Sequence, residues 1–314
     1  MANGSLLASK PLVGSWKEGV FMKKHGWVLF MAPAALVIFF MIIMPLSYTL
    51  YMSVHEWFIS SVSEPKFAGL SNYVEILTQD TDLEMGRFSW ALYRTFLYTI
   101  LGVCAQTIIG VALALLFNRH FMGKGLVRTL SLLPMVATPV AISLVWMMMF
   151  NPSLGVLNYF LGFLSLGPVD WVGTDEWVIP SLVMVDTWQW VPLITLITTA
   201  GLAALPVEPY EAARIDGANS WQMFWRITLP LLRPTLMVAI LFRSIDCLKT
   251  FDTIMVITSG GPGTASETLN LYIFQQAFDY FHMGYASALI VIFLAINFGV
   301  CLVLIKYRRQ PIDY

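Results

Sequence analysis

Charged residues are scarce in this sequence. Asp, Glu, Lys and Arg make up only 12% of its 314 residues, and the formal net charge is -1, whereas soluble globular domains are about 25% charged. Without an excess of positive charge, the chain has no electrostatic basis for binding nucleic acid. Hydrophobic residues instead make up 58% of the chain, and the mean hydropathy is +0.72. This composition is typical of a protein surrounded by membrane lipid.

Cysteine and catalytic motifs are also rare or missing. The three cysteines lie far apart inside apolar runs, which excludes the disulfide framework of a small secreted domain. The four histidines have no spacing typical of metal ligands. The sequence contains no G-x-x-x-x-G-K-[ST] phosphate loop, no G-x-S-x-G and no H-E-x-x-H motif. We therefore predict that the chain is not an enzyme and holds no cofactor or metal of its own.

Long apolar runs take the place of charge. A membrane-spanning helix needs about 20 mainly apolar residues, and six stretches meet this requirement: 27–54, 90–117, 126–150, 178–205, 234–257 and 284–305. The first is too long for the apolar region of a signal peptide, which favours a retained helix. We predict an all-α polytopic membrane protein with six transmembrane helices, in which a six-span domain at 27–306 lies between tails at 1–26 and 307–314.

The basic residues are distributed unevenly over the loops. Lys and Arg near the ends of spans are retained on the cytoplasmic side of a membrane. Of the 18 basic residues, 13 lie in the N-terminal tail, between spans two and three, between spans four and five, and at the C-terminal end. The other loops carry mainly Asp and Glu. We therefore predict that both termini are cytoplasmic and that the loop at 206–233 is cytoplasmic too.

This cytoplasmic loop contains the stretch EAARIDGANSWQMFWRITLPLLRP, which begins at Glu211. Pro209 suits the first position of a helix and Gly217 suits a left-handed stop, so one short helix is predicted between them. Ser220 is predicted to cap a second helix, which Pro230 ends. Helices this short are marginal in water, so both must pack against another surface.

An aromatic stripe on the second predicted helix is consistent with two different surfaces. Trp221, Phe224 and Trp225 recur at helical spacing. Exposed aromatic side chains of this kind form contact surfaces for soluble partners, or they lie among lipid headgroups. The spacing alone leaves both interpretations open.

The same loop resembles the signature loop of ATP-binding-cassette (ABC) importer permeases, which reads E-A-A, three residues, G, nine residues, and I/L-x-L-P. The matching residues are Glu211, Ala212, Ala213, Gly217, Ile227, Leu229 and Pro230. A second stretch, FDTIMVITSGGP from Phe251 to Pro262, resembles the carbohydrate branch of that family. The resemblance implies a type I ABC importer permease fold in a bacterial cytoplasmic (inner) membrane.

The resemblance also implies partners. Permeases of this type pair with a second, non-identical permease and receive a carbohydrate from a periplasmic or extracellular solute-binding protein. A homodimeric cytoplasmic ATPase, which binds ATP and Mg, would dock on the coupling helix formed by this loop. The residues implied in that contact are Glu211, Ala212, Ala213, Asp216, Gly217, Ala218, Trp221 and Phe224.

Two predicted spans each contain a polar stripe. A charge at the centre of a span costs roughly 2.5–3.5 kcal/mol on insertion scales, so such residues tend to face the protein interior or a wet cavity. At 3.6 residues per turn, each stripe occupies one face of its helix. The stripes comprise Asp186, Gln189, Trp190 and Leu193 in span four, and Arg243, Asp246, Cys247 and Thr250 in span five. Alignment with the larger permease of the maltose importer, a member of this family, implies that these eight positions bind sugar, although that permease has amides where this chain has Asp and Arg.

The stripes leave two alternatives open. Arg243 and Asp246 suit either cargo binding or a buried structural pair. The formal charges of Asp186, Arg243, Asp246 and Lys249 cancel, which favours a neutral sugar, oligosaccharide or polyol, and Trp190 would stack on a sugar ring. The alternative function is an ion-coupled secondary transporter in which Asp186 and Asp246 bind protons or sodium, but such a carrier has no use for the signature loop.

Overall fold

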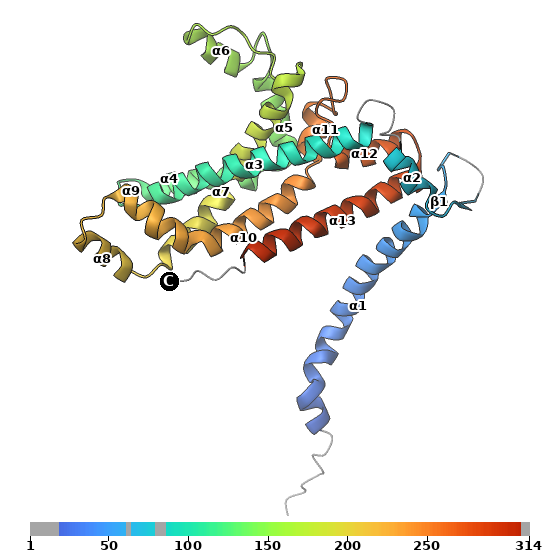
Figure 1. Ribbon diagram of the computed structural model, residues 1–314, viewed down its shortest axis with the longest axis horizontal. Helices are drawn as coiled ribbons and strands as arrows, with labels where there is room; N and C mark the ends of the chain where they lie inside the picture. Colours follow the sequence, from blue (N-terminus) through green and yellow to red (C-terminus); the bar gives the residue numbers. More distant parts are fainter. Residues whose placement is uncertain (1–18, 61–63, 79–85, 309–314) are drawn as a thin grey trace, which may run out of the picture. The chain divides into compact units, whose positions relative to one another are not determined.

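The computed structural model describes residues 19–60, 64–78 and 86–308, and most of these residues are helical (Figure 1). Within these residues, four helices are long and apolar enough to span a membrane, as expected for an all-α membrane protein. They are α1 (Gly19–Ser53), α3 (Arg87–Asn118), α7 (Asp175–Ala203) and α13 (Met283–Arg308). These helices correspond to the first, second, fourth and sixth predicted spans.

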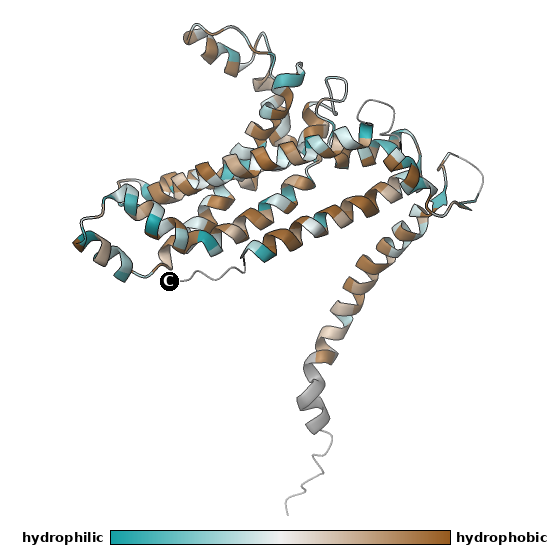
Figure 2. Ribbon diagram, viewed as in Figure 1, coloured by the Kyte–Doolittle hydropathy of each residue, from teal (hydrophilic) through white to brown (hydrophobic). Residues whose placement is uncertain are grey.

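The N-terminal unit of the chain, which ends at Tyr51, is formed by α1. Apolar residues dominate this helix (Figure 2), and no residue of its most apolar stretch is buried. Helix α1 begins at Gly19, inside the predicted tail at 1–26. Residues 1–18 and 309–314 of the two predicted tails lie outside the described residues.

The third predicted span, 126–150, is not one straight helix. It consists of α4 (Lys124–Val136) and α5 (Pro139–Met149), whose axes are bent by 99°. Thr138 has extended backbone angles and Pro139 opens α5, because a residue before proline is disfavoured in the helical region. The prediction of a continuous span was therefore wrong at this point.

The fifth predicted span, 234–257, is also interrupted. Helix α10 (Leu229–Leu248) ends before Lys249, and α11 (Asp252–Ile257) follows as a separate short helix. Counting the bent pair as one span gives up to five apolar spans among the described residues. The more polar α10, which contains Arg233, Arg243 and Asp246, is the remaining candidate, so the count of six stays a prediction.

Helices α3, α7 and α10 form the centre of the second unit and lie side by side (Figure 1). The largest buried cluster includes Tyr98, Trp146 and Leu182. Gly110 on α3 permits the close approach of α7, because a Cβ atom there would lie 2.6 Å from Cγ2 of Ile194. Helix α13 packs against α10.

Short elements connect these helices. They are β1 (His55–Glu56), β2 (Lys66–Phe67), α2 (Ser71–Thr78), α6 (Val156–Phe163), α12 (Leu269–Phe274) and the π-helix η2 (Gln275–Asp279). The two strands pair antiparallel, with His55 opposite Phe67. Gly260, in the G-G-P segment, has a φ of 93°, which glycine tolerates without strain.

The loop between α7 and α10 forms α8 (Glu208–Ile215), α9 (Ser220–Met223) and the π-helix η1 (Phe224–Thr228). Gly217 follows α8 with a φ of 74°, so the predicted left-handed stop is confirmed. The predicted cap at Ser220 is wrong, because Asn219 is the N-cap: its side chain accepts a bond from the Gln222 N–H at 2.9 Å.

Pro230 does not end the second helix, contrary to the prediction. Helices α9, η1 and α10 follow one another without a gap, and Pro230 lies at the first turn of α10. The π-helical turn before it is closed by a bond from the Leu229 N–H to the Phe224 carbonyl. The wider turn lets the helix continue through a residue that has no N–H to donate.

Candidate cargo cavity and coupling surface

The polar stripes of α7 and α10 face the same cavity, which has a volume of about 280 Å³. Six of the eight predicted sugar-binding residues line it: Asp186, Gln189, Trp190, Arg243, Asp246 and Thr250. The other lining residues are Pro139, Lys249, Phe251, Asp252 and Thr253. The cavity thus lies where α10 ends and where α5 begins.

The two remaining predicted residues do not line this cavity. Leu193 is half-buried and is not among the lining residues. Cys247 is buried behind the cavity, where its Sγ accepts a bond from Arg243 Nη2 at 3.1 Å and lies 3.5 Å from Asp186 Oδ2. The role of these two residues in sugar binding stays a prediction.

A buried polar network forms the inner wall. The Arg243 side chain is 1% exposed, and its Nη2 lies 2.9 Å from Asp186 Oδ2. The Arg243 Nε donates to Gln106 Oε1 at 2.7 Å, and Gln106 Nε2 donates to Asp186 Oδ2 at 2.6 Å. These bonds join α3, α7 and α10. Sequence reasoning missed Gln106, because one amide in an apolar span forms no periodic stripe.

Asp246 and Lys249 form the outer wall of the cavity, which is more accessible than the inner wall. Asp246 is 46% exposed; its Oδ2 lies 3.5 Å from Arg243 Nη1, and its Oδ1 lies 3.8 Å from Lys249 Nζ. Arg243 and Asp246 therefore do not form the buried structural pair that was one of the alternatives. The buried partner of Arg243, at the shorter distance, is Asp186. The guanidinium carbon of Arg243 lies 4.8 Å from the centre of the Trp190 ring.

The helix break positions the outer wall. Lys249 is the C-cap of α10, and its carbonyl accepts a bond from the Asn270 side chain at 2.8 Å. This bond satisfies one of the carbonyls that a helix end leaves without a partner. Thr250 and Phe251 connect Lys249 to α11. All three residues line the cavity from irregular backbone.

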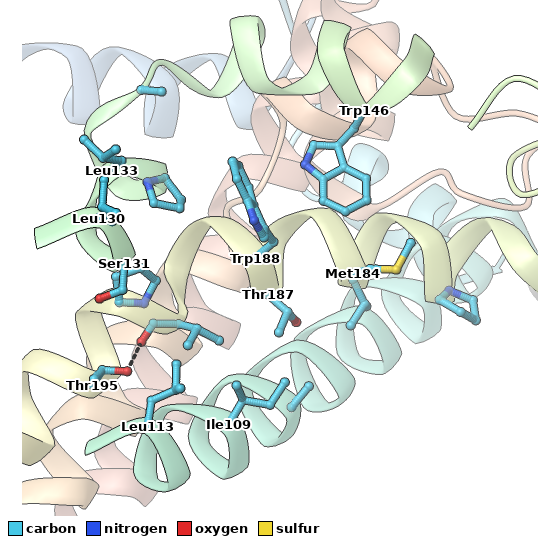
Figure 3. Close-up of a pocket in the computed structure, with 17 residues that line it drawn as sticks. Ile109, Leu113, Leu130, Ser131, Leu133, Trp146, Met184, Thr187, Trp188 and Thr195 are labelled. Atoms are coloured by element: carbon cyan, nitrogen blue, oxygen red, sulfur yellow. Dashed lines mark hydrogen bonds between the residues drawn. The ribbon is translucent and has the colours of Figure 1, made fainter. Parts of the chain in front are cut away.

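A second, larger cavity of about 880 Å³ lies on another face of α7, between α3, α4 and α5 (Figure 3). Its walls are almost entirely apolar, and Trp146 and Trp188 stand beside each other in it with ring centres 5.8 Å apart. No charged residue lines it. Its chemistry suits apolar groups, so the smaller polar cavity remains the candidate for a hydroxyl-rich cargo.

The predicted coupling residues lie on α8, on the turn that follows it, on α9 and at the start of η1. Most of them are exposed, while Ala213, Ala218 and Phe224 are half-buried. The Tyr210 hydroxyl donates to Thr228 Oγ1 at 3.0 Å, which ties α8 to η1. Trp221 is 69% exposed, and its ring centre lies 5.5 Å from that of Trp225. This loop therefore presents an aromatic surface that no described part of the chain covers.

An ion pair at the N-terminal end of α3 was not predicted. Arg87 donates to Glu267 from Nε at 2.9 Å and from Nη2 at 2.6 Å, and Glu267 is 1% exposed. The guanidinium also lies 5.1 Å from the centre of the Tyr272 ring. Burial raises the pKa of the Tyr272 hydroxyl, so this ring stays neutral beneath the cation. The pair fastens the segment after the G-G-P turn to α3.

Comparison with known proteins gives consistent matches. The family model described as "Binding-protein-dependent transport system inner membrane component" matches residues 106–306. The chain is 34% identical to the trehalose/maltose transport system permease of Thermococcus litoralis, over 91% of this chain and 94% of the relative. It is 33% identical to the sulfoquinovosyl glycerol transport system permease of Agrobacterium fabrum, over 90% of each.

The fold has solved counterparts as well. The crystal structure of a bacterial ABC transporter involved in the import of the acidic polysaccharide alginate contains a chain that superposes with a TM-score of 0.77 at 20% identity. The match covers 95% of this chain and 100% of that one. At this identity the likeness concerns the fold alone.

Proposed function

The chain belongs to the family of binding-protein-dependent transport system inner membrane components, and we propose that it translocates a neutral sugar, oligosaccharide or polyol as one permease subunit of an ABC importer. It is a multi-pass protein of the inner membrane, with apolar helices to match. The single observation that carries the assignment of the cargo path is the convergence of polar residues from α7 and α10 on one cavity between apolar helices.

The charges of this cavity favour neutral cargo over acidic cargo. Asp186 and Arg243 compensate each other as a buried pair, and Lys249 compensates Asp246. Asp252 adds a further carboxylate to the lining, so the formal charge of the wall is negative. A carboxylate or sulfonate on the cargo would be repelled, whereas hydroxyl groups can donate to Asp246 and accept from Lys249. The names of the relatives, which include trehalose and maltose permeases, support a saccharide.

The coupling surface is where the ATPase would act on this chain. An ATPase subunit that grips α8 and α9 would pull directly on α10, because α9, η1 and α10 are continuous. Helix α10 carries Arg243 and Asp246, so movement at the loop reaches the cargo cavity through one rigid element. Opening and closing of the ATPase would thus alternate the access of the cavity between the two sides of the membrane.

The remaining partners follow from this role. A homodimeric cytoplasmic ATPase would bind ATP and Mg, a periplasmic or extracellular solute-binding protein would deliver the cargo, and a second, non-identical permease would complete the path. Both termini and the 206–233 loop would then face the cytoplasm. An ion-coupled carrier is disfavoured, because Asp186 is engaged by Arg243 and Gln106 and the family uses binding proteins.

Reconstitution tests the proposal. The chain, its second permease and the ATPase would be placed in liposomes with the solute-binding protein, and uptake of radiolabelled maltose and trehalose would be measured. We expect uptake that requires ATP and the binding protein. Uptake driven by a proton or sodium gradient without ATP would refute the proposal and revive the secondary transporter.

A further inference from the structure

Gln106 is a fully buried amide that has no contact with the cargo cavity. It lies at the middle of α3 with 0% exposure and is not among the residues that line the cavity. Nevertheless, both ends of its side chain are engaged: Oε1 accepts from Arg243 Nε at 2.7 Å, and Nε2 donates to Asp186 Oδ2 at 2.6 Å. Its polar groups are therefore directed at two cavity residues from behind.

The bonds of Arg243 fix the plane of its guanidinium. This group is flat and directs its N–H donors in a rigid fork. Nε is bound to Gln106 on α3, and Nη2 is bound to Asp186 on α7, while the side chain itself starts from α10. Two directional bonds from two other helices leave the plane no freedom to rotate.

The guanidinium of Arg243 in turn lies over the ring of Trp190. The guanidinium carbon lies 4.8 Å from the centre of the indole ring, within the range of a cation–π contact. Trp190 is half-buried and lines the cavity. The orientation of the ring that would face a sugar is thus set by the guanidinium beneath it, and the orientation of the guanidinium is set by Gln106.

We propose that Gln106 is a positioning residue for cargo recognition, which acts through Arg243 to hold Trp190 in place against the cargo. This inference rests on the proposed function, because it assumes that the polar cavity binds a saccharide. Removing the amide would leave Arg243 Nε without its buried acceptor and Asp186 Oδ2 without one of its donors. The guanidinium would then shift toward Asp246, and the Trp190 ring would lose its fixed support.

The first test is the variant Gln106→Leu in the complete transporter, solubilised with its second permease and ATPase. Equilibrium binding of radiolabelled maltose and trehalose is measured, with assembly and basal ATP hydrolysis as controls. We expect binding to weaken about tenfold, the size of one lost aromatic contact, while both controls stay near wild type. Thr99→Val is the matched control, because Thr99 is buried on the same helix and its hydroxyl donates to the Thr95 carbonyl within that helix.

A double-mutant cycle separates positioning from general damage to the fold. If Gln106 acts through Trp190, then Gln106→Leu should weaken binding much less in a Trp190→Leu background than in the wild type. Additive effects of the two substitutions, or unchanged binding by Gln106→Leu alone, would overturn the inference. If the wild type neither binds nor transports any saccharide offered, the proposed function fails and this inference fails with it.

Gln106→Glu covers the case in which Gln106→Leu does not assemble. The substituted carboxyl would face Asp186 on α7 and Arg243 and Cys247 on α10. In its protonated form it has an acceptor for Arg243 and a donor for Asp186, as the amide has. We expect saccharide binding by this variant to recover as the pH is lowered, with no such rise in the wild type. Equal pH profiles for the two proteins would contradict a positioning role.

Discussion

Alanine substitutions of Asp186 and Asp246 should affect different properties: the first should lower stability, and the second should slow transport while stability is kept. The Asp186 side chain is 4% exposed and lies 2.9 Å from a guanidinium that is itself 1% exposed. Removing one partner of such a buried pair costs about 3–5 kcal/mol, because the other charge is left uncompensated. Asp246 is 46% exposed and 3.5 Å from Arg243, and an ion pair as accessible as this one contributes only about 0–1 kcal/mol.

The assay is thermal unfolding of the assembled complex together with uptake in liposomes. For Asp186→Ala we expect poor assembly and a fall in the apparent Tm on the order of 10 °C, given roughly 2–4 °C per kcal/mol for proteins of about 150–250 residues. For Asp246→Ala we expect an apparent Tm within a few degrees of wild type, but slow uptake of maltose and trehalose. An Asp246→Ala variant that unfolds as readily as Asp186→Ala would show that the accessible pair carries structural energy, and the division of the cavity into two walls would be wrong.

Three further predictions concern the cargo, the coupling loop and the second permease. Trp190→Leu and Thr250→Val should each lower uptake while assembly and basal ATP hydrolysis stay unchanged. The control Trp188→Leu, on the apolar face of α7, should transport as the wild type does. Transport at the wild-type rate by both cavity variants would place the cargo elsewhere. Glu211→Arg and Gly217→Pro should each release the ATPase from the membrane complex. Gly217→Pro acts on the backbone, because proline cannot adopt the φ of 74° found at this position. Co-purification of the ATPase in normal amounts with both variants would show that this loop is not the coupling surface. Liposomes that contain this permease, the ATPase and the binding protein but no second permease should take up no maltose or trehalose, and uptake in them would mean that the chain works as a homodimer.

The local features of the fold follow from the sequence, and the long-range ones do not. Apolar runs of sufficient length predicted α3, α7 and α13, because a helix satisfies its backbone within one segment. Helical spacing also predicted that Asp186 and Gln189 would share a face with Trp190, as they do in the cavity. Gln106 meets Arg243 across 137 positions of sequence, and no periodic pattern within one helix can indicate such a contact.

The cap of α9 shows a different limit. Asn219 and Ser220 are adjacent, and both residue types are favoured at an N-cap. The choice is decided by Gln222, three residues after Asn219. Its side-chain oxygen accepts a hydrogen bond from the Asn219 backbone N–H at 2.9 Å. The capping box of this helix was therefore present in the sequence, and the error lay in reading the cap without its reciprocal partner.

The two places where predicted spans proved discontinuous both border the polar cavity between α7 and α10. Pro139 lines the cavity at the bend between α4 and α5, and Lys249, Thr250 and Phe251 line it at the break between α10 and α11. Irregular backbone at membrane depth is tolerated only where protein buries it or where it borders a water-filled cavity, since lipid cannot satisfy its N–H and carbonyl groups. A sequence that interrupts two apolar helices beside the same polar pocket therefore bears a cost that continuous helices would avoid. Both interruptions border the same polar cavity, as expected if that cavity serves transport, because natural sequences break local rules mainly at functional sites.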